Sequence, residues 1–243
     1  NYISHNKKSR EVKAEDSLNK AESQSIHGVI EESADNISKA LKRVSKINQI
    51  TIHGLIDQDL DALKKAKKTV VKLEHEIDEL QNDIFYFIKE LDDSYLGASK
   101  FYIDVIGSIQ DVAQSSSLIA NISHKHVNNN HKALKKKQGE ELLFISDKLA
   151  NLCNEIRKIF DARSFNEIVP SIIEEKQDLL TYVQESIQKQ VERTRYEESS
   201  PKNTTLYFKI LLETKDLIKA NMNILNLYFE ENKNISVRKE ITD

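Results

Sequence analysis

Six carboxylates at helical spacing are the residues of this chain best suited to chemistry. Two of the pairs, Glu74 with Asp78 and Glu174 with Asp178, are separated by four residues, so each pair shares one face of an α-helix. Clustered carboxylate oxygens are the ligands that hard divalent cations prefer. The sequence therefore raises the hypothesis of a metal site. Its candidate ligands are Glu74, Asp78, Asp111, Glu174, Asp178 and Asp216.

A plainer interpretation of these acids is that they form a solvated helix face. The chain contains 39 Asp and Glu residues, so pairs spaced by four arise by chance. The Glu-x-x-His motif that builds di-iron sites in helical bundles is missing. Spacing alone favours the solvated face.

A second group of polar residues follows in the segment HKHVNNNHK (124–132) and the lysines after it. His124 and His126 are two residues apart and point to different sides of a helix, so we expect a surface helix end rather than a metal site. Lys132, Lys135, Lys136 and Lys137 could contact phosphate or an acidic membrane, although a solvated face is the simpler interpretation. Farther on, Arg193 and Arg195 precede Glu197 and Glu198, which predicts local ion pairing.

Recognisable catalytic motifs are absent from the sequence. It has no nucleophile elbow, glycine-rich phosphate loop, paired-cysteine metal site or dinucleotide fingerprint. We therefore expect that the protein is not an enzyme.

The elements that would position these residues are helices. Only five glycines and two prolines occur in 243 residues, and long helices exclude both from their interiors. Apolar residues at helical period predict an all-α fold with six helices. They cover about 33–53, 59–91, 96–127, 133–163, 166–196 and 204–231. We expect Asp59 to cap the second helix, NNN (128–130) to form a turn, and Pro170 to lie in a first helical turn.

An internal repeat divides the chain. Residues 101–122 align without gaps on 206–227, which places Tyr102 on Tyr207 and Asp111 on Asp216. The second helix aligns on the fifth at an offset of 100, which matches the two Glu-x-x-x-Asp pairs. We therefore predict a linker or frayed lead-in (1–32), a three-helix repeat (33–127), a second repeat (128–231) and a loose tail (232–243), with the repeats packed side by side.

Charge and composition exclude other classes. A formal net charge of −3 gives no basic excess for nucleic-acid binding. The single cysteine, Cys153, cannot form an intramolecular disulfide, which fits a reducing compartment. Apolar runs of about 18 residues, the length of a membrane span, do not occur. The chain opens at Asn1 without methionine, so we expect a processed or cut piece whose missing part could hold a membrane domain.

Two stretches resemble a known family. FYIDVIGSIQDVAQSSSLIANISHKHVNNNHK (101–132) and VERTRYEESSPKNTTLYFKILLETKDLIKANMN (191–223) are similar to the PhoU-like cytoplasmic C-terminal domain of bacterial inorganic phosphate transporters. The resemblance covers about residues 33–231. It implies two similar three-helix bundles and metal binding through Glu/Asp-x-x-x-Asp motifs, which Glu74 with Asp78 and Glu174 with Asp178 match. Asp111 and Asp216 match only loosely, since the positions where further acids are expected are Gln110, Gln114, Lys215 and Lys219.

The leading hypothesis is therefore a non-catalytic regulatory domain of a phosphate transporter at the cytoplasmic side of the inner membrane. The resemblance implies divalent or ferric metal ions as cofactors. Its partners would be a membrane-embedded phosphate permease, in the same polypeptide, and a second copy in a homodimer. The alternative is a dimerising helical scaffold without a ligand. Gly54, Gly97 and NNN (128–130) interrupt the heptads, which favours the compact regulator over a rod.

Overall fold

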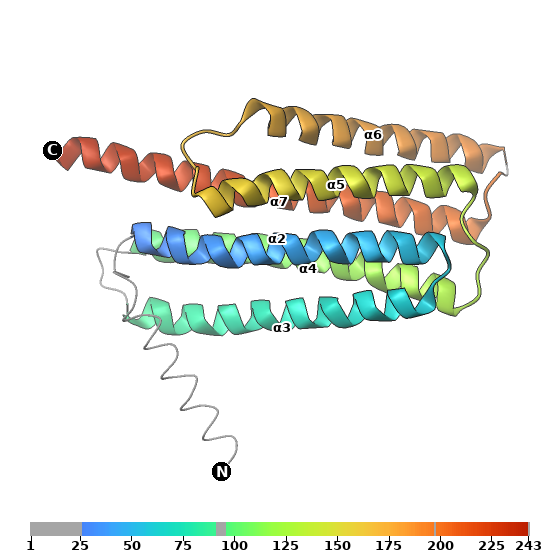
Figure 1. The fold of residues 1–243 in the computed structure, drawn as a ribbon, viewed down its shortest axis with the longest axis horizontal. Helices are drawn as coiled ribbons and strands as arrows, with labels where there is room; N and C mark the ends of the chain where they lie inside the picture. Colours follow the sequence, from blue (N-terminus) through green and yellow to red (C-terminus); the bar gives the residue numbers. More distant parts are fainter. Residues whose placement is uncertain (1–25, 91–95, 197, 243) are drawn as a thin grey trace, which may run out of the picture.

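Six long helices make up the part of the protein that the structure describes, as the sequence predicts (Figure 1). The structure, a computed structural model, describes residues 26–90, 96–196 and 198–242, and these residues contain helices and turns but no strand. The helices are α2 (Ile26–Ile56), α3 (Leu60–Glu90), α4 (Leu96–Asn128), α5 (Lys136–Ala162), α6 (Pro170–Arg195) and α7 (Pro201–Thr242).

Local signals fix most of the helix ends. Asp59 caps α3, because its Oδ1 accepts hydrogen bonds of 3.0 Å from the N–H groups of Asp61 and Ala62. Asn130 has a φ of 53°, the left-handed conformation expected of the NNN turn. Pro170 is in the first turn of α6, where its missing N–H has least effect. All three predictions are confirmed.

The largest differences from the sequence prediction are at two helix boundaries. Helix α2 begins at Ile26 rather than near Ser33, and α7 continues to Thr242 through the segment expected to be a loose tail. Both additions are polar stretches that carry a weak apolar period, which is why the pattern alone ends the helices too early. The expected lead-in over 1–25 and the break expected between the second and third helices lie outside the described residues.

The helices lie along one long axis (Figure 1). Helix α2 runs antiparallel to α5, since Asp35 near the start of α2 pairs with Arg163 at the end of α5, with 2.6 Å between oxygen and nitrogen. Helix α4 runs antiparallel to α7, because Phe101 contacts Tyr228 with ring centroids 5.0 Å apart, whereas Ser108, farther along α4, accepts a hydrogen bond of 2.8 Å from Asn223, earlier in α7. Helix α3 packs on α2 and α4, and α6 packs on α5 and α7. Helices α3 and α6 therefore form opposite edges of the body.

The core is continuous through all six helices. The apolar stripes read from the sequence, such as Ile37, Leu41 and Val44 on α2, are buried in it. Gly54 allows α2 and α3 to approach closely, because a Cβ there would lie 3.1 Å from the Leu63 side chain. At the end where α2 and α4 begin, four aromatic rings meet; this aromatic cluster is Phe101, Phe160, Phe165 and Tyr228.

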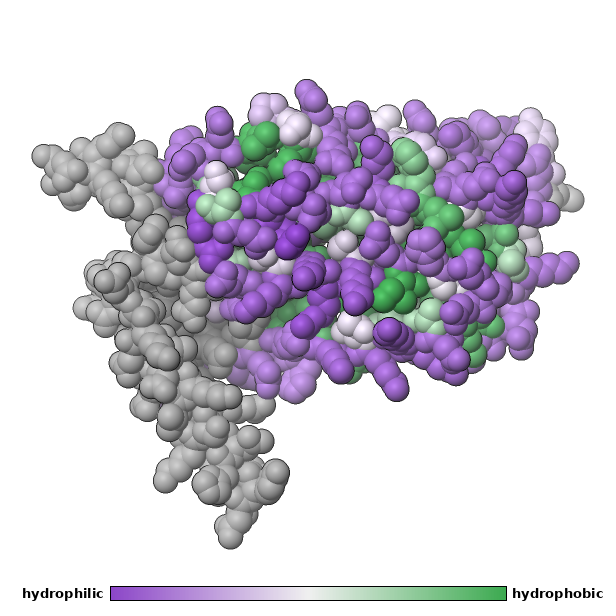
Figure 2. Space-filling model, viewed as in Figure 1, coloured by the Kyte–Doolittle hydropathy of each residue, from purple (hydrophilic) through white to green (hydrophobic). Residues whose placement is uncertain are grey.

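The face shown in Figure 2 is mainly hydrophilic, with separate hydrophobic patches between the helices. None of the helices, over the residues that the structure describes, has a stretch long and apolar enough to cross a membrane.

Candidate functional site

Two of the predicted carboxylates line one groove between α4 and α7. Asp111 of α4 and Asp216 of α7 both line this groove, which has a volume of about 670 Å³. Glu213 lines it as well, and Lys219 lies 3.7 Å from the Asp216 carboxylate in an exposed ion pair. The antiparallel packing of α4 and α7 explains this arrangement, since it brings the repeat-related positions 111 and 216 to the same groove. The groove thus carries three acids, and the ammonium group of Lys219 would compete with a metal cation for the Asp216 carboxylate.

Another predicted pair lines a smaller pocket between α5 and α6. Glu174 and Asp178 lie on α6 and share a pocket of about 440 Å³ with the ring pair Phe144 and Tyr182, whose centroids are 4.4 Å apart. Lys148 faces the Phe144 ring at 5.8 Å. Burial raises the pKa of the neighbouring carboxyl Glu175, against the opposing charge of Lys148.

The third pair, Glu74 and Asp78, is on the outer part of α3. Glu74 is half-buried and Asp78 is exposed. The acid between them in sequence, Glu76, forms an ion pair with Arg43 of α2. This helix lies on the opposite side of the body from α6 (Figure 1), so the two Glu-x-x-x-Asp pairs do not meet.

The six candidate ligands therefore occupy three separate places. In residues 26–90, 96–196 and 198–242, groups of three or more His, Cys, Asp or Glu arranged to hold a metal ion are absent. The groove between α4 and α7 comes nearest to the hypothesised metal site, because Asp111 and Asp216 both line it. The amide and lysine side chains of Gln114 and Lys219 in the same groove reduce its density of carboxylates.

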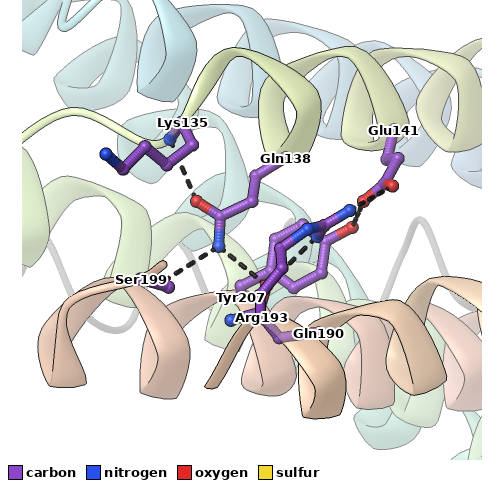
Figure 3. Close-up of polar contacts among 7 residues, drawn as sticks. All are labelled: Lys135, Gln138, Glu141, Gln190, Arg193, Ser199 and Tyr207. Atoms are coloured by element: carbon purple, nitrogen blue, oxygen red, sulfur yellow. Dashed lines mark hydrogen bonds and ion pairs between the residues drawn. The ribbon is translucent and has the colours of Figure 1, made fainter. Parts of the chain in front are cut away.

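A buried polar cluster, which the sequence did not reveal, lies where α5 begins, α6 ends and α7 begins (Figure 3). We define it as Gln138, Glu141, Gln190, Arg193 and Tyr207. Arg193 pairs with Glu141 at 2.5 Å, and each side chain is only 11% exposed. The hydroxyl of the fully buried Tyr207 donates a hydrogen bond to the same carboxylate. Arg193 thus turns inward to α5, whereas the expectation for it was local ion pairing; Glu197, one of the expected local partners, lies outside the described residues.

The two glutamines extend this cluster to the chain segments around it. Gln138 and Gln190 are both fully buried, and the Gln138 amide donates to the Gln190 side chain at 2.8 Å. Gln138 also accepts the backbone N–H of Lys135 at 2.9 Å, which caps the start of α5. The Gln190 amide donates to Thr204 of α7 at 3.3 Å. Buried amides satisfied in this way fix the relative positions of three helix ends.

Electrostatics within the cluster follow from its burial. Burial lowers the pKa of Arg193, but its hydrogen bond and charge interaction with Glu141 outweigh that effect and the net pKa is raised. Burial, and then the hydrogen bond and negative charge of Glu141, raise the pKa of Tyr207 well above its usual range. The Arg193 guanidinium also lies 5.8 Å from the centre of the Tyr207 ring. Arg193 therefore stays charged and the Tyr207 phenol stays neutral at physiological pH.

The histidine segment is only partly the surface helix end that we expected. His126 is buried, with its Nε2 3.0 Å from the Lys132 carbonyl oxygen and its ring 5.1 Å from the His131 ring. These contacts hold the turn between α4 and α5. Burial and the charges of Lys67 and Lys64 lower the pKa of His124.

Cys153 lies inside the bundle on α5. Its side chain is buried, and burial raises the pKa of the thiol to about 12. Because the thiolate is the reactive form, this cysteine is a packing residue.

The cluster has a weak trace in the sequence. Gln138, Glu141 and Gln190 occupy positions that continue the buried stripes of α5 and α6, where apolar residues are expected. Arg193 and Tyr207 both fall within residues 191–223. Polar residues at core positions are the signal that would have indicated buried partners, but the pattern does not say which helices supply them.

Comparison with known proteins does not assign this chain. No protein-family model matches it, and no curated protein matches its sequence.

Proposed function

We propose that this chain is a non-catalytic regulatory domain of a bacterial inorganic phosphate transporter, with a PhoU-like fold of two related three-helix bundles. In this proposal α2, α3 and α4 form one bundle and α5, α6 and α7 the other. The proposal places the domain at the cytoplasmic side of the inner membrane, where it contacts a membrane-embedded phosphate permease of the same polypeptide.

One observation carries the proposal. Asp111 and Asp216 hold equivalent positions in the sequence repeat and line the same groove between α4 and α7. Two related halves packed about an approximate two-fold axis bring equivalent residues together at their junction. The antiparallel pairing of α2 with α5, beside that of α4 with α7, supports the same arrangement.

The groove is then the surface through which the domain regulates uptake. Its exposed Leu118 provides apolar area, and Asp111, Glu213 and Asp216 provide negative charge. A permease loop or helix with basic residues would fit this combination. A divalent or ferric ion bound by Asp111 and Asp216 would alter that charge and so link metal level to uptake.

The test is phosphate uptake by cells that produce the full-length protein. We compare wild type with the double variant Asp111→Asn and Asp216→Asn, which keeps side-chain volume and removes the charge. The matched control is Asp147→Asn with Glu192→Gln, two exposed acids outside the groove. The proposal expects uptake to change in the groove variant alone, at unchanged protein level. Equal uptake in all three proteins contradicts it.

Metal binding is tested separately on the purified chain. Elemental analysis and calorimetry with Mn²⁺, Zn²⁺ and Fe³⁺ compare wild type with the groove variant and with Glu74→Ala and Glu174→Ala. Loss of binding in the groove variant supports the groove, whereas loss in either alanine variant alone points to the Glu-x-x-x-Asp pairs. A protein that binds none of the ions removes the metal from the proposal. Ultracentrifugation distinguishes the alternative scaffold function, because a scaffold dimerises without dependence on metal.

A further inference from the structure

One end of the bundle concentrates positive charge. We define this basic end as residues 57–68 and 124–140, which comprise the turn before α3, the first turns of α3, the last turn of α4, the connector and the start of α5. Figure 1 shows these segments together at one end of the body. They contain nine lysines and four acidic residues, which gives a net charge of +5 in a chain whose formal charge is −3.

The lysines come from different helices and lie close in space. The charges of Lys64 and Lys67 on α3 both act on His124 of α4, which places residues from two helices in one electropositive region. The neighbouring segment 189–202 does not neutralise it, because it contains four basic and three acidic residues. The charge is therefore a property of the folded end and not of one sequence run.

Most of this charge has no ion-pair partner among the residues that the structure describes. In the described part of the chain, ion pairs of these nine lysines are limited to Lys64 with Asp61 at 3.3 Å and Lys136 with Glu140 at 3.8 Å. Both pairs are exposed and close in sequence, so they contribute little. Lys65, Lys132 and Lys137 are exposed as well. Their positive field extends into solvent over about a Debye length.

We propose that the basic end docks against an anionic phospholipid surface. The lysines are spread over several helix ends, and the groove between α4 and α7 and the pocket between α5 and α6 include none of these nine. Spread lysines on flexible stems suit a plane of many headgroup phosphates, whereas one free phosphate needs converging donors. Docking at this end orients the helix axes roughly perpendicular to the membrane plane, so that the groove between α4 and α7 opens parallel to the membrane. The inference stands on charge and geometry and does not depend on the proposed function.

The experiment is co-sedimentation of the protein with lipid vesicles. Vesicles of phosphatidylcholine mixed with phosphatidylglycerol are compared with pure phosphatidylcholine at low and high salt. The proposal expects binding to the anionic vesicles at low salt and its loss at high salt. Equal binding to neutral vesicles, binding that resists salt, or no binding overturns it.

Matched variants locate the surface. The triple variant Lys65→Gln, Lys132→Gln and Lys137→Gln removes three charges from the basic end. Each substitution is expected to weaken vesicle binding about fivefold, so the triple variant should bind about a hundredfold more weakly than the wild type. The control Lys39→Gln, Lys42→Gln and Lys46→Gln removes three exposed charges along α2. Circular dichroism confirms that both variants are folded. An equal loss in both variants indicates a general charge effect and overturns the assignment to this end.

His124 supplies an independent readout. Headgroup phosphates near His124 favour its charged form, so its pKa measured by NMR should rise when anionic vesicles are added. Inorganic phosphate without vesicles is the second arm. If it raises the pKa as much as vesicles do and releases the protein from them, the site recognises free phosphate and the membrane proposal fails.

Discussion

Two buried tyrosines of α7 lie in opposite environments near the two ends of the bundle. The Tyr228 ring packs edge-on against Phe160 at 4.6 Å and Phe101 at 5.0 Å, and its hydroxyl donates to Ser33 at 2.6 Å. Tyr207 lies in the buried polar cluster, with its hydroxyl on the Glu141 carboxylate and Arg193 beside its ring. Both side chains are fully buried.

The comparison shows two ways to fix helix ends. The aromatic cluster is held by apolar area and ring geometry, so its stability follows the volume that is filled. The buried polar cluster requires every partner, because a carboxylate or guanidinium left alone in the interior loses its compensation. At the polar end, the free energy of unfolding should therefore fall when one charge is removed and recover in part when its partner is neutralised as well. At the aromatic end, it should depend on the side-chain volume that is removed.

The largest effect is expected at the aromatic cluster. Phe160→Ala removes a fully buried ring that contacts Phe165 and Tyr228, and should lower the free energy of unfolding by about 4 kcal/mol in urea titrations. The matched control is Phe144→Ala, since Phe144 is 43% exposed and should cost much less. Similar losses in the two variants would show that the aromatic cluster does not hold this end.

Breaking the ion pair should come next. Arg193→Met leaves the Glu141 carboxylate buried without its cation, and should cost about 3 kcal/mol. Adding Glu141→Gln removes the orphan charge and keeps an acceptor for Tyr207, so the double variant should recover part of the loss. Strictly additive losses in this double-mutant cycle would mean that the pair is not coupled.

Removing one hydroxyl at a time compares the tyrosines directly. Tyr207→Phe deletes a hydrogen bond to a charged carboxylate and should cost about 2 kcal/mol, whereas Tyr228→Phe deletes one to a neutral hydroxyl and should cost about 1 kcal/mol. Thermal and urea unfolding of both variants measure the difference. The reverse order would show that the two environments differ less than the contacts indicate.

An effect that is absent at neutral pH is expected on stability at alkaline pH. Burial raises the pKa of both tyrosines above the usual value of about 10. Below that value both states keep the phenolic protons, so stability is unaffected. Above it the unfolded chain loses protons first, and the free energy of unfolding should fall by about 1.4 kcal/mol per pH unit for each tyrosine. Urea denaturation at several pH values below and above about pH 10 measures how the free energy of unfolding changes with pH. This change should be smaller in the double variant Tyr207→Phe with Tyr228→Phe than in the wild type. An equal change in both proteins excludes these tyrosines as its cause.

Much of the fold could be predicted from the sequence, since its causes are local. Scarce glycine and proline, a helical apolar period and residues such as Asp59 and Pro170 act within a few positions of themselves. The all-α class, the number of helices and most turns follow from them. The alignment of Asp111 with Asp216 also identified two residues that line one groove.

Only the tertiary structure decided which polar residues meet. Gln138 and Gln190 are 52 residues apart in sequence, and Glu141 and Tyr207 are 66 apart. The helical period predicts that such residues face inward. A polar group is buried only where another helix supplies a hydrogen-bond partner, and the packing of the helices decides which residue that partner is. The same packing separated Glu74 and Asp78 from Glu174 and Asp178, because α3 and α6 lie at opposite edges of the body.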